Sequence, residues 1–371
     1  MEGPRLVRRN EVPELSNLLC EVFGFDGIYD KAEFTKGLLR PVQLRGGMIV
    51  VEDGRPVSYI LNVVDEVSVY GCRFKVASIG GVCTDKAYRN CGYAGQVLAE
   101  TLRSTTAAGA RVMIVSGNRS LYERNHCVPA GDLLAASTSR EQMPSPDPSL
   151  TVRRFSVKDW GELSPLSAAE PVRFVRPYDF FAKCCCWWDV SRPEVWVLSG
   201  ADGPLAYLSL LPPWRREERG SRSVGDYGGS RSAILGALPL ICEATEVDTV
   251  SFRFPRQDRE LSYLMSSQGF ALKPSTLSGT HRVLNLPGLM HDLRPYLAAR
   301  LSGSQLRRLS FDQSGESCAI TLGSERLDMD LSAAVVLVFG GKGAPRVGGE
   351  LGEVLRAVFP VPFPMPGFNY V

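Results

Sequence analysis

The sequence predicts an α/β (α+β) fold with two similar mixed-sheet domains in tandem, followed by a small third α+β domain. The first 140 residues alternate in the order β-α-β-β-β-α-β-α, and the closing part of that order recurs between residues 150 and 286. A chain of 371 residues is also long for a single core, and 44% hydrophobic residues are typical of an ordinary globular protein.

The first domain is expected to begin with a short strand over residues 6–9 and a helix over residues 12–23, whose leucines share one face. Three stretches then predict an antiparallel meander: MIVVED, VSYILNVVDEVSVY and FKVASIGGVCT. A helix over residues 92–108, an apolar strand in RVMIVSG and a short helix in NRSLYERN complete the domain.

The Ser- and Pro-rich stretch STSREQMPSPDPSL indicates a boundary, so we expect domains at residues 1–140, 150–286 and 287–371. In the second domain the order strand, glycine turn, helix, strand and short helix repeats that of the first, which suggests a diverged duplication. In the third, LMHDLRPYLAARL predicts a helix, and LSFDQ and SCAITLG predict strands. The apolar ending GFNYV predicts a buried terminus, because chain ends are usually polar and loose.

Composition argues against several classes of protein. The 42 basic and 40 acidic residues nearly cancel, which gives no support to a nucleic-acid or membrane partner. No stretch approaches the roughly 18 apolar residues of a membrane helix, and the N-terminus lacks the apolar core of a signal peptide, so we expect a cytoplasmic protein. The ten cysteines form no CxxC pair and the three histidines have no metal-ligand spacing, so we expect no metal.

The stretch VCTDKAYRNCGYAGQVLAE, residues 82–100, predicts a strand, a turn and a helix with Gly92 and Gly95 in its first turn. Each glycine costs roughly 1 kcal/mol against alanine inside a helix, so we expect a ligand to need the bare backbone. Unpaired amides at a helix N-terminus bind phosphate, and Arg89 adds a guanidinium for a diphosphate. The turn follows three antiparallel strands, which argues against a Rossmann site, and no GxxxxGK[ST] motif occurs.

The segment RNCGYA, residues 89–94, resembles the [Q/R]-x-x-G-x-[G/A] pyrophosphate motif of the GCN5-related N-acetyltransferases (GNAT), and the order of elements is similar to theirs. The resemblance implies coenzyme A binding, with acetyl-CoA as co-substrate, and backbone contacts to the thioester from Val82, Cys83 and Thr84. The diphosphate contacts that it implies are those of Arg89, Asn90, Cys91, Gly92, Tyr93 and Ala94.

Two residues after the following strand also match the family. The resemblance implies that Asn118 contacts the cofactor and that Tyr122 protonates the leaving thiolate. In the family this tyrosine is usually followed by three residues and then Gly-Phe, whereas His126 and Cys127 replace that pair in this chain.

The substrate that receives the acetyl group is expected to be a cationic amine. Asp26 and Asp30, in GFDGIYD, lie in the loop that usually forms the acceptor wall, and we expect them to contact the substrate. Ordinary loop acids are the alternative for both.

The layout of the whole chain resembles the Eis-like acetyltransferases, which combine a GNAT domain, a degenerate second GNAT-like domain and a small C-terminal domain like sterol carrier protein 2. The resemblance implies a homo-oligomer, a trimer or hexamer, and a general-base role for the terminal carboxylate of Val371. The family's usual terminal aromatic residue is absent, and a packing role for the terminus is the alternative.

These expectations predict an N-acetyltransferase that moves acetyl from acetyl-CoA to a primary amine of a small molecule or peptide by direct attack. A covalent route through Cys83 or Cys91 lacks an adjacent base. The alternative from another class is a non-catalytic protein that binds coenzyme A or an apolar ligand and keeps a vestigial transferase site. Aminoacyl transfer from tRNA would need a basic groove, for which the charge balance gives no support.

Overall fold

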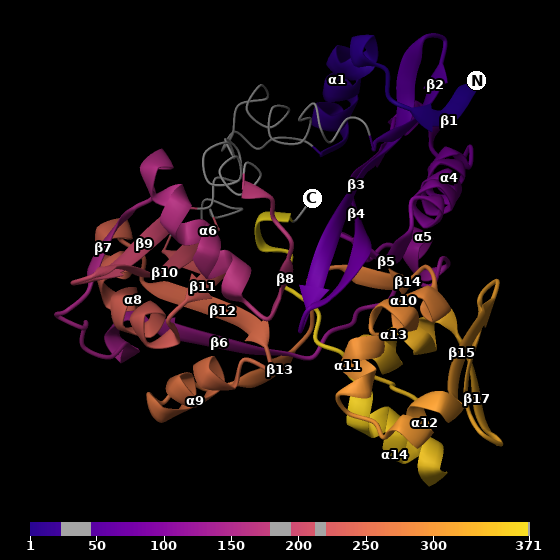
Figure 1. The fold of residues 1–371 in the computed structure, drawn as a ribbon. Coiled ribbons are helices and arrows are strands. Elements are labelled where there is room, and N and C mark those ends of the chain that lie inside the picture. The colour runs from indigo at the N-terminus through magenta and orange to yellow at the C-terminus, as the bar shows by residue number, and fades with distance from the viewer. Residues whose placement is uncertain (24–45, 179–193, 212–219, 370–371) are drawn as a thin grey trace. The chain divides into compact units, whose positions relative to one another are not determined.

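The computed structural model describes residues 1–23, 46–178, 194–211 and 220–369 (Figure 1). The chain divides into two compact units. Unit 1 comprises Met1–Gly131, Leu277–Val361 and Asn369–Val371, and unit 2 comprises Asp132–Thr276 and Pro362–Phe368. These bounds differ from the predicted boundaries at residues 140 and 287, because β6 (Leu133–Ser139) pairs into the sheet of unit 2 and β14 (Thr280–Val283) pairs into the sheet of unit 1.

The main sheet of unit 1 has the strand order β1-β2-β3-β4-β5-β14. Its strands are β1 (Glu2–Leu6), β2 (Met48–Glu52), β3 (Arg55–Val69), β4 (Cys72–Thr84), β5 (Ala110–Val115) and β14 (Thr280–Val283). Neighbours run antiparallel except β4 and β5, which are parallel and joined through α4 (Tyr93–Ala107). The predicted meander and crossover helix are confirmed.

The N-terminal strand lies earlier than predicted. It ends at Leu6, and residues 9–11 form a 3₁₀ turn that leads into α1 (Val12–Phe23). The Arg8 amide donates to the Glu11 carboxylate at 2.7 Å, so a capped turn replaces the strand expected over residues 6–9.

Helices cover both faces of this sheet. The leucines of α1 pack on one face, in a cluster that includes Tyr59 and Cys83. Val97 and Leu98 of α4 pack on the opposite face. Each face therefore has its own core, and the predicted amphipathic helix over residues 12–23 is confirmed.

The last strand of this sheet comes from a distant part of the sequence. His281 of β14 pairs with Ile114 of β5, and its backbone also exchanges hydrogen bonds of 2.8 and 3.0 Å with Val128. The side chain of His281 is 1% exposed, and burial lowers its pKa to about 4. Residues that were predicted to belong to the second domain thus complete the sheet of unit 1.

Residues 286–358 of unit 1 form a three-stranded antiparallel meander and five α-helices. The strands are β15 (Leu309–Ser314), β16 (Ser317–Leu322) and β17 (Glu325–Asp330). The helices are α10 (Leu286–Asp292), α11 (Arg294–Ala298), α12 (Gly303–Arg308), α13 (Leu331–Phe339) and α14 (Gly349–Val358). The single helix predicted from LMHDLRPYLAARL is divided at Leu293, just before Pro295, because proline has no amide to continue the hydrogen-bond ladder.

Unit 2 repeats the architecture, with the strand order β13-β6-β12-β11-β10-β9-β7. Its strands are β6 (Leu133–Ser139), β7 (Thr151–Arg154), β9 (Glu194–Gly200), β10 (Gly203–Leu210), β11 (Ser221–Gly229), β12 (Thr249–Pro255) and β13 (Lys273–Ser275), whereas β8 (Val172–Phe174) is not part of this sheet. Its helices are α6 (Trp160–Ala169), α8 (Arg231–Thr245) and α9 (Arg259–Ser267). Here β11 and β12 are the parallel pair, and β6 pairs antiparallel with β12 as β14 does with β5. The start of the predicted linker is therefore a strand of the second sheet.

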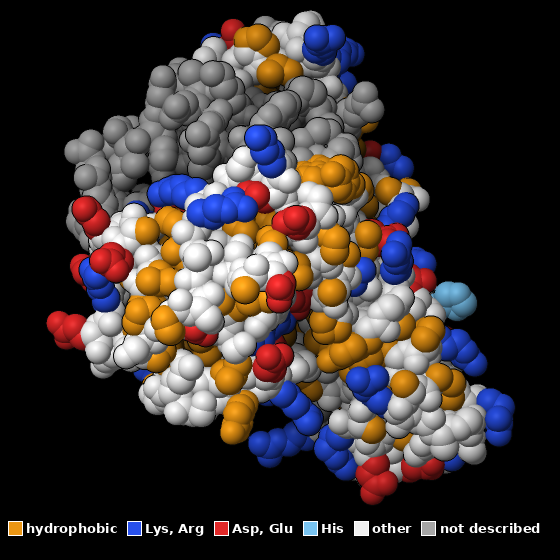
Figure 2. All heavy atoms as spheres, turned by 60° about the vertical axis from the view of Figure 1, so that its left-hand side comes forward, with side chains coloured by type: hydrophobic (Ala, Val, Ile, Leu, Met, Phe, Trp, Pro, Cys, Tyr) orange, Lys and Arg blue, Asp and Glu red, His pale blue; other side chains and the backbone are white. Residues whose placement is uncertain are grey.

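Figure 2 shows one face of the molecule, on which Lys and Arg side chains are interspersed with Asp and Glu among the described residues. No helix in this part of the chain is long and apolar enough to cross a membrane. Over the same described ranges, no group of three or more His, Cys, Asp or Glu side chains is arranged to hold a metal ion.

Candidate functional site

The candidate site begins at a bulge in β4. Tyr59 of β3 pairs with Cys83, whereas Leu61 pairs with Gly80, so β4 carries one extra residue between these pairs. Gly81 lies in the bulge with φ +56°, a left-handed conformation that glycine adopts at little cost. The bulge was not predicted, although adjacent glycines inside a strand pattern such as SIGGVCT are a signal for one.

Strands β4 and β5 diverge beside this bulge. Their parallel pairing ends at Ile79 and Val115, and the Ser116 amide still donates to the Ile79 carbonyl at 3.1 Å. Residues 82–84 extend β4 past that point. Among the described residues, no residue of β4 beyond Ile79 pairs with β5. Because the two strands are parallel, the segments that follow them emerge at the same edge of the sheet.

Helix α4 begins at this edge. Its N-cap, Gly92, has φ +80° and provides no side-chain cap. A Cβ added to Gly92 or Gly95 would meet no atom within 4 Å, so packing inside the chain does not require glycine at either position. The first-turn amides have no intrahelical acceptor, and open space lies beside both glycines. This arrangement fits a diphosphate group.

The other motif residues surround the same turn. Residues 89–91 are exposed, and the Arg89 guanidinium forms no ion pair within the part of the chain that the structure describes. Tyr93 and Ala94 are half-buried at the start of α4. The Tyr93 hydroxyl donates to the Glu52 carboxylate, so its side chain is engaged within the chain and its backbone amide is the group left for a ligand.

Tyr122 lies on α5 (Ser120–Glu123), directly after β5, and Asn118 is exposed in the preceding turn. The Tyr122 side chain is 5% exposed, and burial raises its pKa to about 12, so its hydroxyl stays protonated at neutral pH. Gly117 lies against the ring, because a Cβ added there would stand 2.9 Å from Cε2 of Tyr122. Gly117 was not singled out from the sequence, where it reads as an ordinary turn glycine.

Cys83 is unsuited to covalent catalysis. Its side chain is buried on the α1 face, and burial raises the pKa of its thiol to about 12. A thiol is a poor nucleophile while it stays protonated. Cys83 can therefore contribute its backbone, but not its sulfur, to a site at the open end of β4.

Three predicted site residues, Asp26, Asp30 and Val371, lie outside the described residues. The segment before Val371 is described as far as Asn369. Phe368 is 3% exposed and Asn369 is 4% exposed, so the predicted burial of the chain's ending is confirmed up to that residue.

The site thus combines four predicted features at one edge of the first sheet: the end of β4, the glycine turn, the start of α4, and the segment after β5 that carries Asn118 and Tyr122. Residues 4–126 match the family model described as "Acetyltransferase (GNAT) domain". The matched residues include the whole of this edge. A search of curated proteins found no match.

Several solved structures are similar over nearly the whole chain. A GCN5-related N-acetyltransferase from Anabaena variabilis has a TM-score of 0.67 at 14% identity, with 97% of this chain and 98% of that one covered. A GCN5-related N-acetyltransferase from Kribbella flavida has a TM-score of 0.67 at 16% identity, with 98% of this chain and 98% of that one covered. Eis1 from Mycobacterium abscessus has a TM-score of 0.62 at 14% identity, with 97% of this chain and 98% of that one covered.

At this level of identity the solved structures show the fold alone. They confirm the predicted class, an α/β protein with mixed sheets like those of the N-acetyltransferases. The family-model match supports an acyltransferase in the first part of the chain.

Proposed function

We propose that this chain is an N-acetyltransferase that moves the acetyl group of acetyl-CoA directly to a primary amine of a small molecule or peptide. The observation that carries the proposal is the opening between β4 and β5 beside the N-terminus of α4. This geometry offers a strand edge for an extended arm and a cluster of amides for a diphosphate at its end.

The first-turn amides of α4 and the Arg89 guanidinium would hold the diphosphate. Gly92 supports this role, because its left-handed backbone turns the chain into the helix without a side chain in front of the amides. Arg89 adds a charged, fork-shaped donor from the exposed side of the turn. Asn90, Cys91, Tyr93 and Ala94 would take part through their backbones.

Bound acetyl-CoA supplies the thioester as acyl donor. Residues 82–84 would orient it, because their backbone groups lie on the edge of β4 that has lost β5 as partner. Asn118 would make a further polar contact at the same edge.

Tyr122 would act on the departing sulfur. With a pKa near 12, its phenol remains protonated and can donate a hydrogen bond or a proton as negative charge develops there. A free thiol has a pKa of about 8.5, so the sulfur can leave as a thiolate and the hydrogen bond from Tyr122 stabilises that charge. The contribution expected of one such bond is about 1.5–3 kcal/mol.

The remaining roles extend the same proposal. The carboxylate of Val371 would accept the proton of the amine, and Asp26 and Asp30 would contact the amine before reaction. Burial of Phe368 supports the first role, since it anchors the chain three residues before its end. Residues 287–371 would form a domain like sterol carrier protein 2, and the enzyme would assemble as a trimer or hexamer.

Thiol release from acetyl-CoA in the presence of polyamines, aminoglycosides and lysine peptides tests the activity. The transferase proposal predicts turnover with at least one amine. Tyr122→Phe should then lower kcat by about 10- to 150-fold while acetyl-CoA affinity changes little, because the lost hydrogen bond forms mainly in the transition state. Normal turnover in this variant would remove Tyr122 from the mechanism.

The non-catalytic alternative makes a different prediction in the same assay. It expects coenzyme A binding by calorimetry but no thiol release with any amine. Absence of both binding and release would reject the coenzyme A site itself.

A further inference from the structure

Unit 2 carries a second strand–turn–helix at the topological position of the first. The parallel pairing of β11 with β12 ends at Ser223 and Ser251, whereas β11 continues to Gly229. Helix α8 begins two residues later, at Arg231. The second sheet therefore also opens beside a helix N-terminus.

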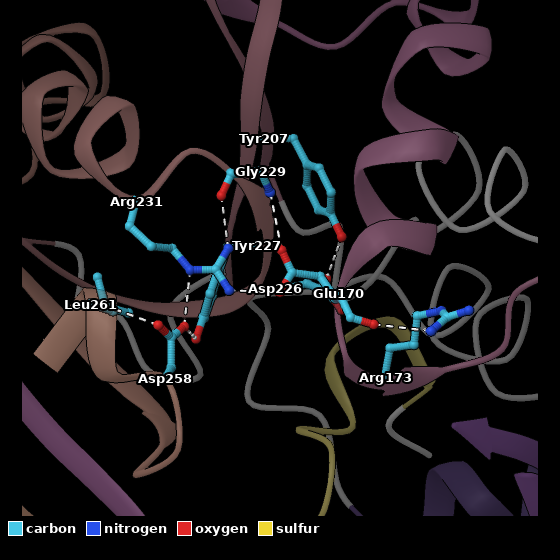
Figure 3. A network of polar contacts seen from close by, with 9 residues as sticks. All are labelled: Glu170, Arg173, Tyr207, Asp226, Tyr227, Gly229, Arg231, Asp258 and Leu261. Carbon is cyan, nitrogen blue, oxygen red and sulfur yellow. Dashed lines mark hydrogen bonds and ion pairs between the residues drawn. The ribbon is translucent and has the colours of Figure 1, made fainter. Parts of the chain in front are cut away.

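Beside this opening, Arg231, which follows β11, contacts Asp258, which follows β12 (Figure 3). Arg231 is 9% exposed, and its Nε donates to Oδ2 of Asp258 at 2.9 Å. The Tyr227 hydroxyl donates to the same oxygen at 3.1 Å, and the Arg231 guanidinium lies 4.9 Å from the centre of the Tyr227 ring. Oδ1 of Asp258 accepts from the Leu261 amide at 3.0 Å and so caps α9.

The carboxylate of Glu170, at the end of α6, completes the cluster. Its Oε1 accepts from the Gly229 amide at 3.1 Å and from Nη1 of Arg231 at 2.7 Å, and its Oε2 accepts from Nη2 at 2.6 Å. A guanidinium fork together with a backbone amide is a donor set that proteins present to carboxylates and phosphates. The Glu170 and Arg231 side chains are only 16% and 10% exposed, so this pair is largely withdrawn from water.

The N-terminus of α8 is capped by a side chain, whereas the N-terminus of α4 is not. The N-cap of α8, Ser230, accepts from the Ala233 amide through its hydroxyl at 3.2 Å. The N-cap of α4, Gly92, makes no side-chain cap. In unit 2, the side chains of Glu170 and Ser230 thus accept hydrogen bonds from backbone amides at the helix N-terminus. In unit 1, no side chain of the N-cap does so.

We propose that Glu170 is a tethered anion that occupies an oxyanion site formed by the Gly229 amide and the Arg231 guanidinium. While Glu170 is in place, unit 2 binds no diphosphate there. Removal of its carboxylate leaves a site for a small carboxylate from solution. This inference concerns the resting chain and does not depend on transferase activity.

The test is chemical rescue of Glu170→Ala in the full chain by sodium formate, with sodium chloride at equal ionic strength as reference. All five tryptophans lie between residues 160 and 214, inside unit 2, so tryptophan fluorescence follows the unfolding of that unit. In chloride, Tm should fall by roughly 5–15 °C, because the variant leaves a buried guanidinium with one partner fewer. Formate should raise Tm again in a saturable manner, since it binds the folded state.

The matched control is the double variant Glu170→Ala/Arg231→Met, which removes the guanidinium as well and should show no formate response. Wild type should show none either, because its site is filled. An equal formate response in wild type or in the double variant would overturn the proposal.

Glu170→Gln keeps the shape of the side chain without its charge, and it should lower Tm less than Glu170→Ala and ignore formate. If Glu170→Ala fails to fold in chloride, refolding in formate alone supports the site. Failure in both salts, together with a Gln variant as stable as wild type, rejects it.

Discussion

Gly92→Ala, compared with Gly109→Ala, separates a ligand requirement from a backbone requirement. The two glycines flank the same helix, with φ of +80° before α4 and +86° after it. A Cβ added at either position would meet no atom within 4 Å. The two substitutions therefore impose the same strain and no clash, but only Gly92 stands at the proposed diphosphate site.

The left-handed conformation costs an L-residue about 1–2 kcal/mol, so both variants should lose that much stability. For a unit of this size the loss corresponds to a fall in Tm of roughly 2–8 °C. This strain is present in free and bound protein alike, so it cancels from the dissociation constant of coenzyme A. A methyl group beside the first-turn amides should displace a charged hydrogen bond worth about 1.5–3 kcal/mol, which weakens binding by roughly 10- to 150-fold.

Calorimetric titration of coenzyme A into both variants and wild type, with Tm measured in parallel, supplies the comparison. Gly92→Ala should lose affinity and Gly109→Ala should keep it, at similar Tm. If the two variants bind coenzyme A equally well, the glycine serves the turn alone and the diphosphate assignment is wrong.

Five further outcomes are expected. Gly117→Ala should lower kcat, measured by thiol release, because the new Cβ displaces the Tyr122 ring; an unchanged kcat would show that the ring position is not critical. Stability to urea should fall by about 2 kcal/mol between pH 7 and pH 5, since the His281 pKa of about 4 lies below its unfolded value of about 6.5 and the unfolded chain takes up the proton first. His281→Leu should flatten that dependence. Cys83→Ala should keep normal turnover, and a loss of turnover would indicate a role for the sulfur. Deletion of Val371 should lower kcat if its carboxylate is the base.

Local patterns predicted most of the first sheet, because each element there is built from neighbouring residues. The alternation in VSYILNVVDEVSVY and the apolar face of residues 12–23 are enough to define a strand and a helix without knowledge of what they pack against. The glycine turn of RNCGYA likewise carries its chemistry within six residues. The fold class and the proposed diphosphate site could therefore both be predicted from short windows of sequence.

The unpredicted features depend on partners far apart in the chain. LLAASTS and THRV each form a strand, but nothing local says that the first belongs to the second sheet and the second to the first. The contact between the Tyr122 ring and Gly117 could not be predicted from the sequence either, since it depends on how the ring packs in the folded chain. The role of Glu170 requires α6, β11 and α8 to be brought together, so the sequence shows only that DYGGSRSA lacks the arginine spacing of the motif.

The proposed anion sites of the two units differ in only a few residues of the turn before the helix. Both place a parallel strand pair, an early divergence and a helix N-terminus at one edge of a sheet. Unit 1 has a glycine N-cap and an exposed Arg89 at that edge, whereas unit 2 has a serine that caps its own helix and a buried Arg231 already held by Glu170. Since the fold is shared and the residues of the turn are not, we expect only the turn of unit 1 to bind a diphosphate, with a stoichiometry of one coenzyme A per chain.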